Sequence, residues 1–164
     1  MNKILKTNGF TLIELIIVVA IIALLASAGF VAINPGKRSG DANNAKRWSD
    51  VTAIADAYSA YLVDNAGTAP TSTTAGVTYS ITSSTGGTTF AVCENATGNP
   101  TTTTALVNLE GLVAGGYIGA IPLDPTYTGT DGYNTGYYFY RETGGKLVIG
   151  SCESYNSTNI ELVR

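Results

Sequence analysis

Residues 10–33 read FTLIELIIVVAIIALLASAGFVAI and contain a single charged side chain, that of Glu14. An α-helix rises about 1.5 Å per residue, so a helix over this stretch would be about 36 Å long. The hydrocarbon core of a bilayer is about 30 Å thick. The stretch is therefore predicted to form a helix that is long enough to span a membrane.

The nine residues before this stretch, MNKILKTNG, carry Lys3 and Lys6 and no acidic residue. A secretory signal peptide also starts with basic residues, but its apolar region is about 7–15 residues long and ends at a cleavage site of small residues. Ala26-Ser27-Ala28 resembles such a site. The greater apolar length and the acid near its start favour a retained helix over a cleaved signal peptide.

Glu14 is the one ionisable side chain of the apolar stretch. A lone carboxylate inside a bilayer costs about 3 kcal/mol, and such groups are functional candidates. Two interpretations are open: Glu14 stays hydrated at the level of the lipid headgroups, or it pairs with a cation of another molecule. If the chain were cut after Gly9, the new α-amine of Phe10 on a neighbouring copy would be that cation, and neither charge would be buried alone.

The string GFTLIEL at residues 9–15, with its short basic leader and long apolar tail, resembles the processing site of type IV prepilins. The resemblance covers about the first 33 residues. It implies that a prepilin peptidase cuts between Gly9 and Phe10 and methylates the new N-terminus of Phe10. It also implies that Glu14 directs assembly. The implied parts are a leader (1–9), a transmembrane and assembly helix (10–36) and a head domain (37–164).

The same resemblance implies a structural subunit, the major pilin of a type IV pilus, which supports adhesion, twitching motility or DNA uptake. Its implied partners are copies of itself, the prepilin peptidase and methyltransferase, and an inner-membrane assembly platform with its motor. Nucleic acid enters only as a possible cargo. The prepilin would lie in the inner membrane and the assembled filament outside the cell. The alternative within the family is a pseudopilin of type II secretion, which forms a periplasmic piston.

The apolar helix departs from the family pattern in one feature, its lack of a proline. Pilins often carry a proline within this helix, whereas the first proline here is Pro35, so Gly29 and Asn34-Pro35-Gly36 are the candidates for a weak point. Basic residues also flank both ends of the helix, with Lys37 and Arg38 following it. Their count does not orient the span, and the resemblance places the N-terminus in the cytoplasm.

Residues 41–65 are predicted to form a second helix, because apolar side chains recur there at steps of three and four. The recurring positions are Ala45, Trp48, Val51, Ile54 or Ala55, Tyr58, and Tyr61 or Leu62. Asp41 is a candidate N-cap, and Lys46 and Asp50 form a predicted i,i+4 ion pair. Trp48 and the tyrosines are predicted to be core residues beneath a sheet. The two helices are expected to join into one spine that ends at Asn65-Ala66-Gly67.

The rest of the chain is predicted to form an antiparallel sheet that rests on this second helix, which makes the fold class α+β. Alternating patterns indicate strands, and Gly-rich turns separate them. The predicted strands are residues 77–81, 90–92, 136–141 and 146–153, followed by an apolar C-terminal segment at 160–162. Residues 106–117 are predicted to form a short amphipathic helix ended by Gly115-Gly116.

Cys93 and Cys152 are the only cysteines, and both fall in predicted strands of the part expected to be exported. In an oxidising compartment they are predicted to form one disulfide, worth about 4 kcal/mol on the chain-entropy model. Asp124 and Asp131 could offer oxygen ligands to calcium, as a loop in this neighbourhood does in related pseudopilins. Their spacing fits no EF-hand loop, so no metal and no cofactor are predicted.

Composition argues against catalysis. Charged residues are 13% of the chain, histidine is absent and the formal net charge is −3. The commonest general base is therefore missing, and so are a nucleophile elbow, a phosphate-binding loop and a basic footprint for nucleic acid. The chain is predicted not to be an enzyme. The alternative of another class is a membrane-anchored enzyme or binding domain.

Overall fold

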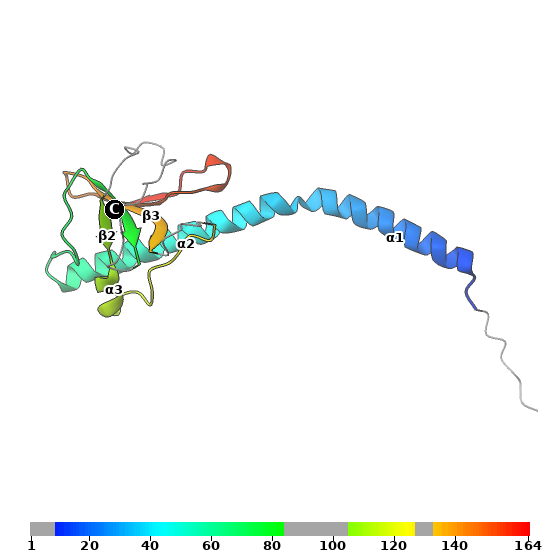
Figure 1. Cartoon of the computed structure of the whole chain (residues 1–164), viewed down its shortest axis with the longest axis horizontal. Coiled ribbons are helices and arrows are strands. Elements are labelled where there is room, and N and C mark those ends of the chain that lie inside the picture. The colour runs from blue at the N-terminus through cyan, green and yellow to red at the C-terminus, as the bar shows by residue number, and fades with distance from the viewer. Residues whose placement is uncertain (1–8, 84–104, 127–132) are drawn as a thin grey trace, which may run out of the picture. The chain divides into compact units, whose positions relative to one another are not determined.

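The computed structural model describes residues 9–83, 105–126 and 133–164 (Figure 1). The chain divides into two compact units, Met1–Ser39 and Gly40–Arg164. In chain order the elements are helices α1 (Leu12–Ile33) and α2 (Pro35–Asp64), strands β1 (Thr78–Thr82) and β2 (Leu106–Asn108), helix α3 (Glu110–Ala114), strands β3 (Asn134–Arg141) and β4 (Leu147–Ser151), the 3-10 helix η1 (Tyr155–Ser157) and strand β5 (Glu161–Val163).

Helix α1 is the apolar helix that the sequence predicts. Among the described residues it is the one helix that is long and apolar enough to cross a membrane, and its candidate span is the 19-residue stretch Leu12–Phe30. Every residue from Thr11 to Phe30 is exposed. The apolar side chains of this part of α1 are therefore not buried.

Asn34 separates α1 from α2. It adopts a left-handed conformation with φ 44°, which asparagine tolerates better than most residues, and Pro35 disfavours a helical residue before it. The Asn34 side-chain Oδ1 accepts a hydrogen bond from the backbone N–H of Lys37 at 3.2 Å. Proline suits the first turn because its missing N–H would be unpaired there. Asn34 therefore ends α1 and caps α2, and the other candidate weak point, Gly29, lies inside α1.

The second helix starts earlier than predicted. Residues 41–65 were the expected range, but α2 runs over Pro35–Asp64, so the prediction that Asp41 caps a new helix is wrong. Asp41 lies inside α2 and is exposed. The predicted Lys46–Asp50 ion pair is confirmed, with Lys46 Nζ 2.6 Å from Asp50 Oδ2.

The five strands form one sheet in the order β2-β1-β3-β4-β5. Strands β1–β3, β3–β4 and β4–β5 pair antiparallel, whereas β1 and β2 pair parallel. The predicted class, α+β with a sheet packed on a helix, is confirmed, and the parallel pair adds one feature that the sequence pattern did not indicate. The predicted strand at residues 90–92 lies outside the described residues.

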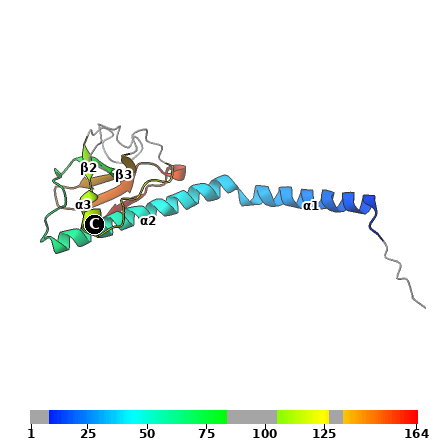
Figure 2. The same cartoon turned by 60° about the horizontal axis from the view of Figure 1, so that its bottom comes forward.

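One face of the sheet packs on α2 and forms the main core, and Figure 2 shows the sheet lying against that helix. Tyr58 of α2 contacts Phe139 of β3 edge to face, with ring centroids 5.2 Å apart. The buried residues of this core are Val51, Ile54, Ala55, Ala57, Tyr58, Ile81, Val107, Leu109, Leu112, Ile121, Tyr137, Phe139, Leu147, Ile149 and Ile160.

Trp48 is not a core residue, and the prediction that it is one was wrong. Its side chain is 39% exposed, and Ala45 is exposed too. The buried face of α2 instead passes through Arg47, Val51 and Ile54. Residues three and four apart share a face, so a buried residue at 47 lines up with 51 and 54, whereas 48 lies at the border.

The segment 106–117 is a strand followed by a short helix, and not the single helix that its leucines suggested. Val107 pairs with Ile81 in the sheet and is buried there. The side-chain Oδ1 of Asn108 then accepts a hydrogen bond from the backbone N–H of Glu110 at 2.7 Å, which turns the chain into α3. Gly115 caps the end of α3 as predicted.

Candidate functional site

The predicted processing site lies at the start of the described chain. Gly9 and Phe10 precede α1, belong to no helix or strand, and are both exposed. The side chain of Phe10 is 88% exposed. The peptide bond that joins the two residues is therefore open to a peptidase.

Thr11 and Glu14 form a capping box at the first turn of α1. The backbone N–H and the hydroxyl of Thr11 both donate to Glu14 Oε2, at 2.8 and 2.7 Å. The Thr11 hydroxyl in turn accepts a hydrogen bond from the Glu14 backbone N–H at 3.3 Å. The second carboxylate oxygen of Glu14, Oε1, has no donor among the described residues. One oxygen thus orders the helix end while the other is available to a further donor.

Thr11 is a functional candidate that the sequence analysis missed. A usable signal was present, because Thr-x-x-Glu immediately before an apolar run is a sequence signature of a helix start. The structure gives Glu14 a local role in addition to the predicted intermolecular one. Both roles use the same carboxylate.

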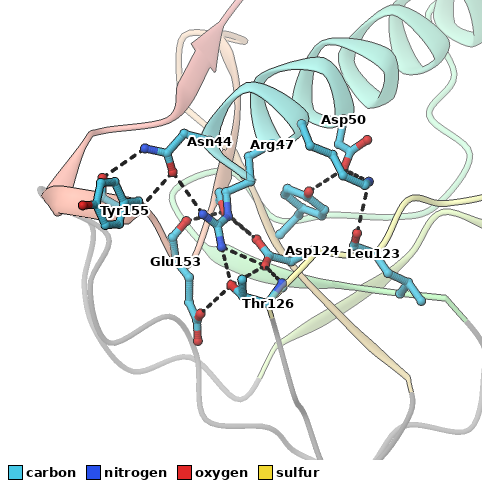
Figure 3. Close-up of polar contacts among 12 residues, drawn as sticks. Asn44, Arg47, Asp50, Leu123, Asp124, Thr126, Glu153 and Tyr155 are labelled. Atoms are coloured by element: carbon cyan, nitrogen blue, oxygen red, sulfur yellow. Dashed lines mark hydrogen bonds and ion pairs between the residues drawn. The ribbon is translucent and has the colours of Figure 1, made fainter. Parts of the chain in front are cut away.

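A second polar site lies inside the unit Gly40–Arg164, where Arg47 of α2 meets Asp124 (Figure 3). Arg47 Nε–H donates a hydrogen bond to Asp124 Oδ2 at 2.5 Å, and Arg47 Nη2–H donates a second one to Asp124 Oδ1 at 3.0 Å. Both side chains are buried. Arg47 also donates to Thr126, whose backbone N–H donates to Asp124 Oδ1 at 2.8 Å. The pair is bidentate, which is the strongest form of this contact.

The network continues from Arg47 to the segment after β4. Arg47 Nη1 donates to Asn44 Oδ1 at 3.0 Å. The Asn44 amide pairs with the backbone of Tyr155 in both directions, donating to its carbonyl at 3.0 Å and accepting from its N–H at 2.8 Å. The hydroxyl of Ser151 donates to Asp124 at 3.2 Å. Together, Asn44, Arg47 and Asp124 therefore connect α2 with the segment 124–126, the end of β4 and Tyr155.

The electrostatics of this site follow from burial and hydrogen bonding. Burial alone raises the pKa of the Asp124 carboxyl, but hydrogen bonds from Arg47 and Thr126 outweigh it and hold that pKa below its usual range. The hydrogen bond to Asp124 raises the pKa of Arg47. Burial and a hydrogen bond to Asp50 raise the pKa of the Tyr137 hydroxyl well above its usual value. Arg47 and Asp124 are thus both charged at neutral pH.

Arg47 and Asp124 neutralise each other's charge and fill each other's hydrogen-bonding positions, which suits a structural role within the fold. Asp124 was a candidate calcium ligand, and its carboxylate is engaged by Arg47 and Thr126 instead. Its proposed partner Asp131 lies outside the described residues. Within the described ranges no three His, Cys, Asp or Glu side chains cluster as a metal site.

The predicted disulfide involves one residue that the structure describes. Cys152 follows β4 directly and is buried. Cys93 lies outside the described residues. The Cys93–Cys152 bond therefore stays a prediction.

Comparison with known proteins locates a family motif in the N-terminal segment. Residues 4–30 match the model of the prokaryotic N-terminal methylation motif, a span that contains Gly9, Phe10, Thr11 and Glu14. No curated protein and no solved structure matches the chain. The motif implies processing by a prepilin peptidase, membrane anchoring before assembly, and assembly into pilus-like fibres in general.

The fold agrees with the motif. An N-terminal apolar helix followed by a five-stranded sheet that packs on a second helix matches the pilin fold. Residues 4–30 of this chain are thus a prokaryotic N-terminal methylation motif, the hallmark of type IV pilin-like prepilins.

Proposed function

We propose that this chain is the major structural subunit of a type IV pilus, which polymerises into a filament at the cell surface and has no enzymatic activity. The observation that carries the proposal is α1, whose apolar residues are exposed and whose one charge lies in the first turn. An apolar helix without cover in its own chain needs either lipid or other copies around it.

The proposed mechanism is a transfer of α1 from lipid to protein. The prepilin is held in the inner membrane by α1, and the peptidase removes residues 1–9 and methylates Phe10. An assembly platform and its motor then extract the subunit, and α1 packs against copies of itself in the fibre. Because lipid tails are about as apolar as these side chains, the net gain is small. A small gain suits a filament that is also taken apart.

Glu14 selects the position of each incoming subunit in this mechanism. In the fibre core an unpaired carboxylate would cost several kcal/mol, and so would an unpaired amine. The α-amine of a neighbouring Phe10 reaches the available Oε1 of Glu14, and the two charges compensate each other. The sequence contains no Lys or Arg between Phe10 and Ile33 that could take this place. One axial offset between subunits is therefore favoured over slipped ones.

The proposal that the chain is not an enzyme is supported by the absence of histidine from the sequence and by the internal pairing of Arg47 and Asp124. Adhesion, twitching motility and DNA uptake are functions that such a filament would serve. Nucleic acid would be a cargo of the fibre.

The test compares Glu14→Val and Glu14→Gln with the matched head-domain variants Glu110→Val and Glu110→Gln, each as the only subunit in the cell. Glu110 is an exposed acid at the start of α3. We expect all four to be inserted and cleaved, but only the Glu110 variants to give abundant filaments in electron micrographs of sheared cell surfaces. Gln should rescue assembly poorly, since it cannot neutralise the amine.

Abundant, long filaments from Glu14→Val cells would contradict the role given to Glu14. The wild-type chain also distinguishes two assemblies. Long fibres in the sheared fraction support a pilus, whereas short fibres confined to the periplasm would support the pseudopilin alternative.

A further inference from the structure

We propose that Lys37 and Arg38 bind the phosphate groups of anionic phospholipids at the outer face of the inner membrane while the subunit is stored there. This inference rests on the proposed function, because it requires α1 to span the membrane. Both side chains are exposed, and both lie in the same compact unit as α1, Met1–Ser39. Their depth relative to the span is therefore set within one unit.

The spacing along the chain places these two residues at headgroup level. The apolar helix ends at Ile33, and Lys37 and Arg38 follow it by four and five residues. Asn34 interrupts the helix between them, and within α2 Lys37 and Arg38 lie only two and three residues after Pro35, about 3–5 Å along that helix. The headgroup layer occupies about 5–8 Å on each side of the hydrocarbon core. The positive charges thus lie where lipid phosphates lie.

Neither residue has an acidic partner in the described part of the chain. Lys46, Arg47, Lys146 and Arg164 each form an ion pair there, whereas Lys37 and Arg38 form none. Asp41, one turn further along α2, forms no ion pair with either of them in the described ranges. An external anion is therefore the partner that the arrangement leaves open.

Phosphate suits both side chains. Arg38 can donate two parallel hydrogen bonds to one phosphate, and Lys37 acts as a compact positive charge. Successive residues of a helix point about 100° apart, so the two side chains do not share a face. Lipid headgroups surround a spanning helix on all sides, so a shared face is not required.

The full chain is reconstituted into vesicles of phosphatidylcholine mixed with phosphatidylglycerol. It is then extracted from them in small discs of the surrounding lipid. Native mass spectrometry then gives the ratio of the two lipids that remain on the protein. The variants are Lys37→Gln, Arg38→Gln and their double. Lys146→Gln is the matched control, because it removes one exposed positive charge from the head. Resistance to alkaline carbonate extraction is measured for each protein.

We expect the wild-type chain to retain phosphatidylglycerol in excess over its share of the bilayer. A juxtamembrane basic residue is worth about 1 kcal/mol, so each substitution should lower this preference about fivefold, and the double variant should lose it. Lys146→Gln should keep it, and all variants should resist extraction.

Equal lipid ratios for wild type and the double variant would overturn the inference while leaving the proposed function intact. If alkaline carbonate extracts the wild-type chain from vesicles, both the inference and the proposed function are overturned.

Discussion

Arg47 and Asp124, which are 77 residues apart in the sequence, form a buried bidentate ion pair that joins α2 to the segment before β3. Asn44 and Thr126 lie around them and take part in the remaining hydrogen bonds (Figure 3). The hydroxyl of Ser151 donates a further hydrogen bond to Asp124. A buried pair of charges is tolerable only when each charge is paired and its other polar atoms are satisfied. This pair meets both conditions, so removal of either partner leaves the other as an isolated buried charge.

Arg47→Met and Asp124→Leu should each destabilise the head by about 3–5 kcal/mol, because each leaves one buried charge unpaired. The double variant Arg47→Met/Asp124→Leu should recover much of that loss. Denaturant unfolding of the detergent-solubilised chain measures these effects. Lys46→Met is the control, since its ion pair with Asp50 is half exposed and is worth less than about 1 kcal/mol. Additive losses in the double variant would show that the two residues do not act as a pair.

Asp124 should also make the head sensitive to acid. Its pKa in the folded state lies below the value of about 3.9 in the unfolded chain, so the unfolded chain binds the proton more readily. The stabilisation is present above about pH 4 and is lost as the pH falls through the lower folded pKa. Unfolding curves recorded as the pH falls should show this loss in the wild-type chain and less of it in Asp124→Asn. Identical slopes in the two proteins would exclude Asp124 as the source.

Gly40→Ala should destabilise the head by about 1–3 kcal/mol, because a Cβ at this position would overlap the ring of Tyr155. The displaced ring would also pull the Tyr155 backbone away from Asn44. Gly36→Ala is the matched control on the same helix, where the nearest atom to an added Cβ is 3.8 Å away. There alanine should be neutral or stabilising by up to about 1 kcal/mol. Thermal unfolding compares the two, and equal effects would mean that the Tyr155 contact is unimportant.

Processing should leave a chain that begins at Phe10 with a methylated amine. The expected intact mass of purified protein is that of residues 10–164 plus one methyl group. Gly9→Val should block the cut, because a branched side chain replaces the small residue before the scissile bond. Retention of Met1 in the mature protein, or cleavage after Ala28, would contradict the assignment of Gly9 and Phe10.

Cys93→Ala, Cys152→Ala and the double variant should destabilise the head by the same amount, about 2–5 kcal/mol, if the two cysteines form one disulfide. Any one of these changes removes the whole bond, so the losses do not add. Unfolding free energies test the equality, and alkylation of the unreduced protein counts free thiols. Two alkylated thiols in the native chain would rule the bond out.

The sequence allowed the prediction of features that depend on neighbouring residues. The apolar run 10–33 indicates α1 because hydropathy and length are local properties, and Glu14 stands out there as its single charge. The strands 136–141 and 146–153 were predictable from their alternation, and they correspond to β3 and β4. The start of α2 is also encoded locally, in Asn34-Pro35, and not at the candidate cap Asp41.

The tertiary structure was needed for what depends on distant contacts. Periodicity predicted a buried Trp48, but the strands that pack on α2 determine which face is covered, and they cover Arg47. Arg47 can be buried there only because folding brings Asp124 to it, and no short-range pattern records a partner 77 residues away. Likewise, the spacing of the leucines predicts a helix that includes Leu106–Asn108. The segment forms a strand instead, because it pairs with the edge of β1. Local pattern sets what each segment prefers, and the energy of pairing buried groups selects among those preferences.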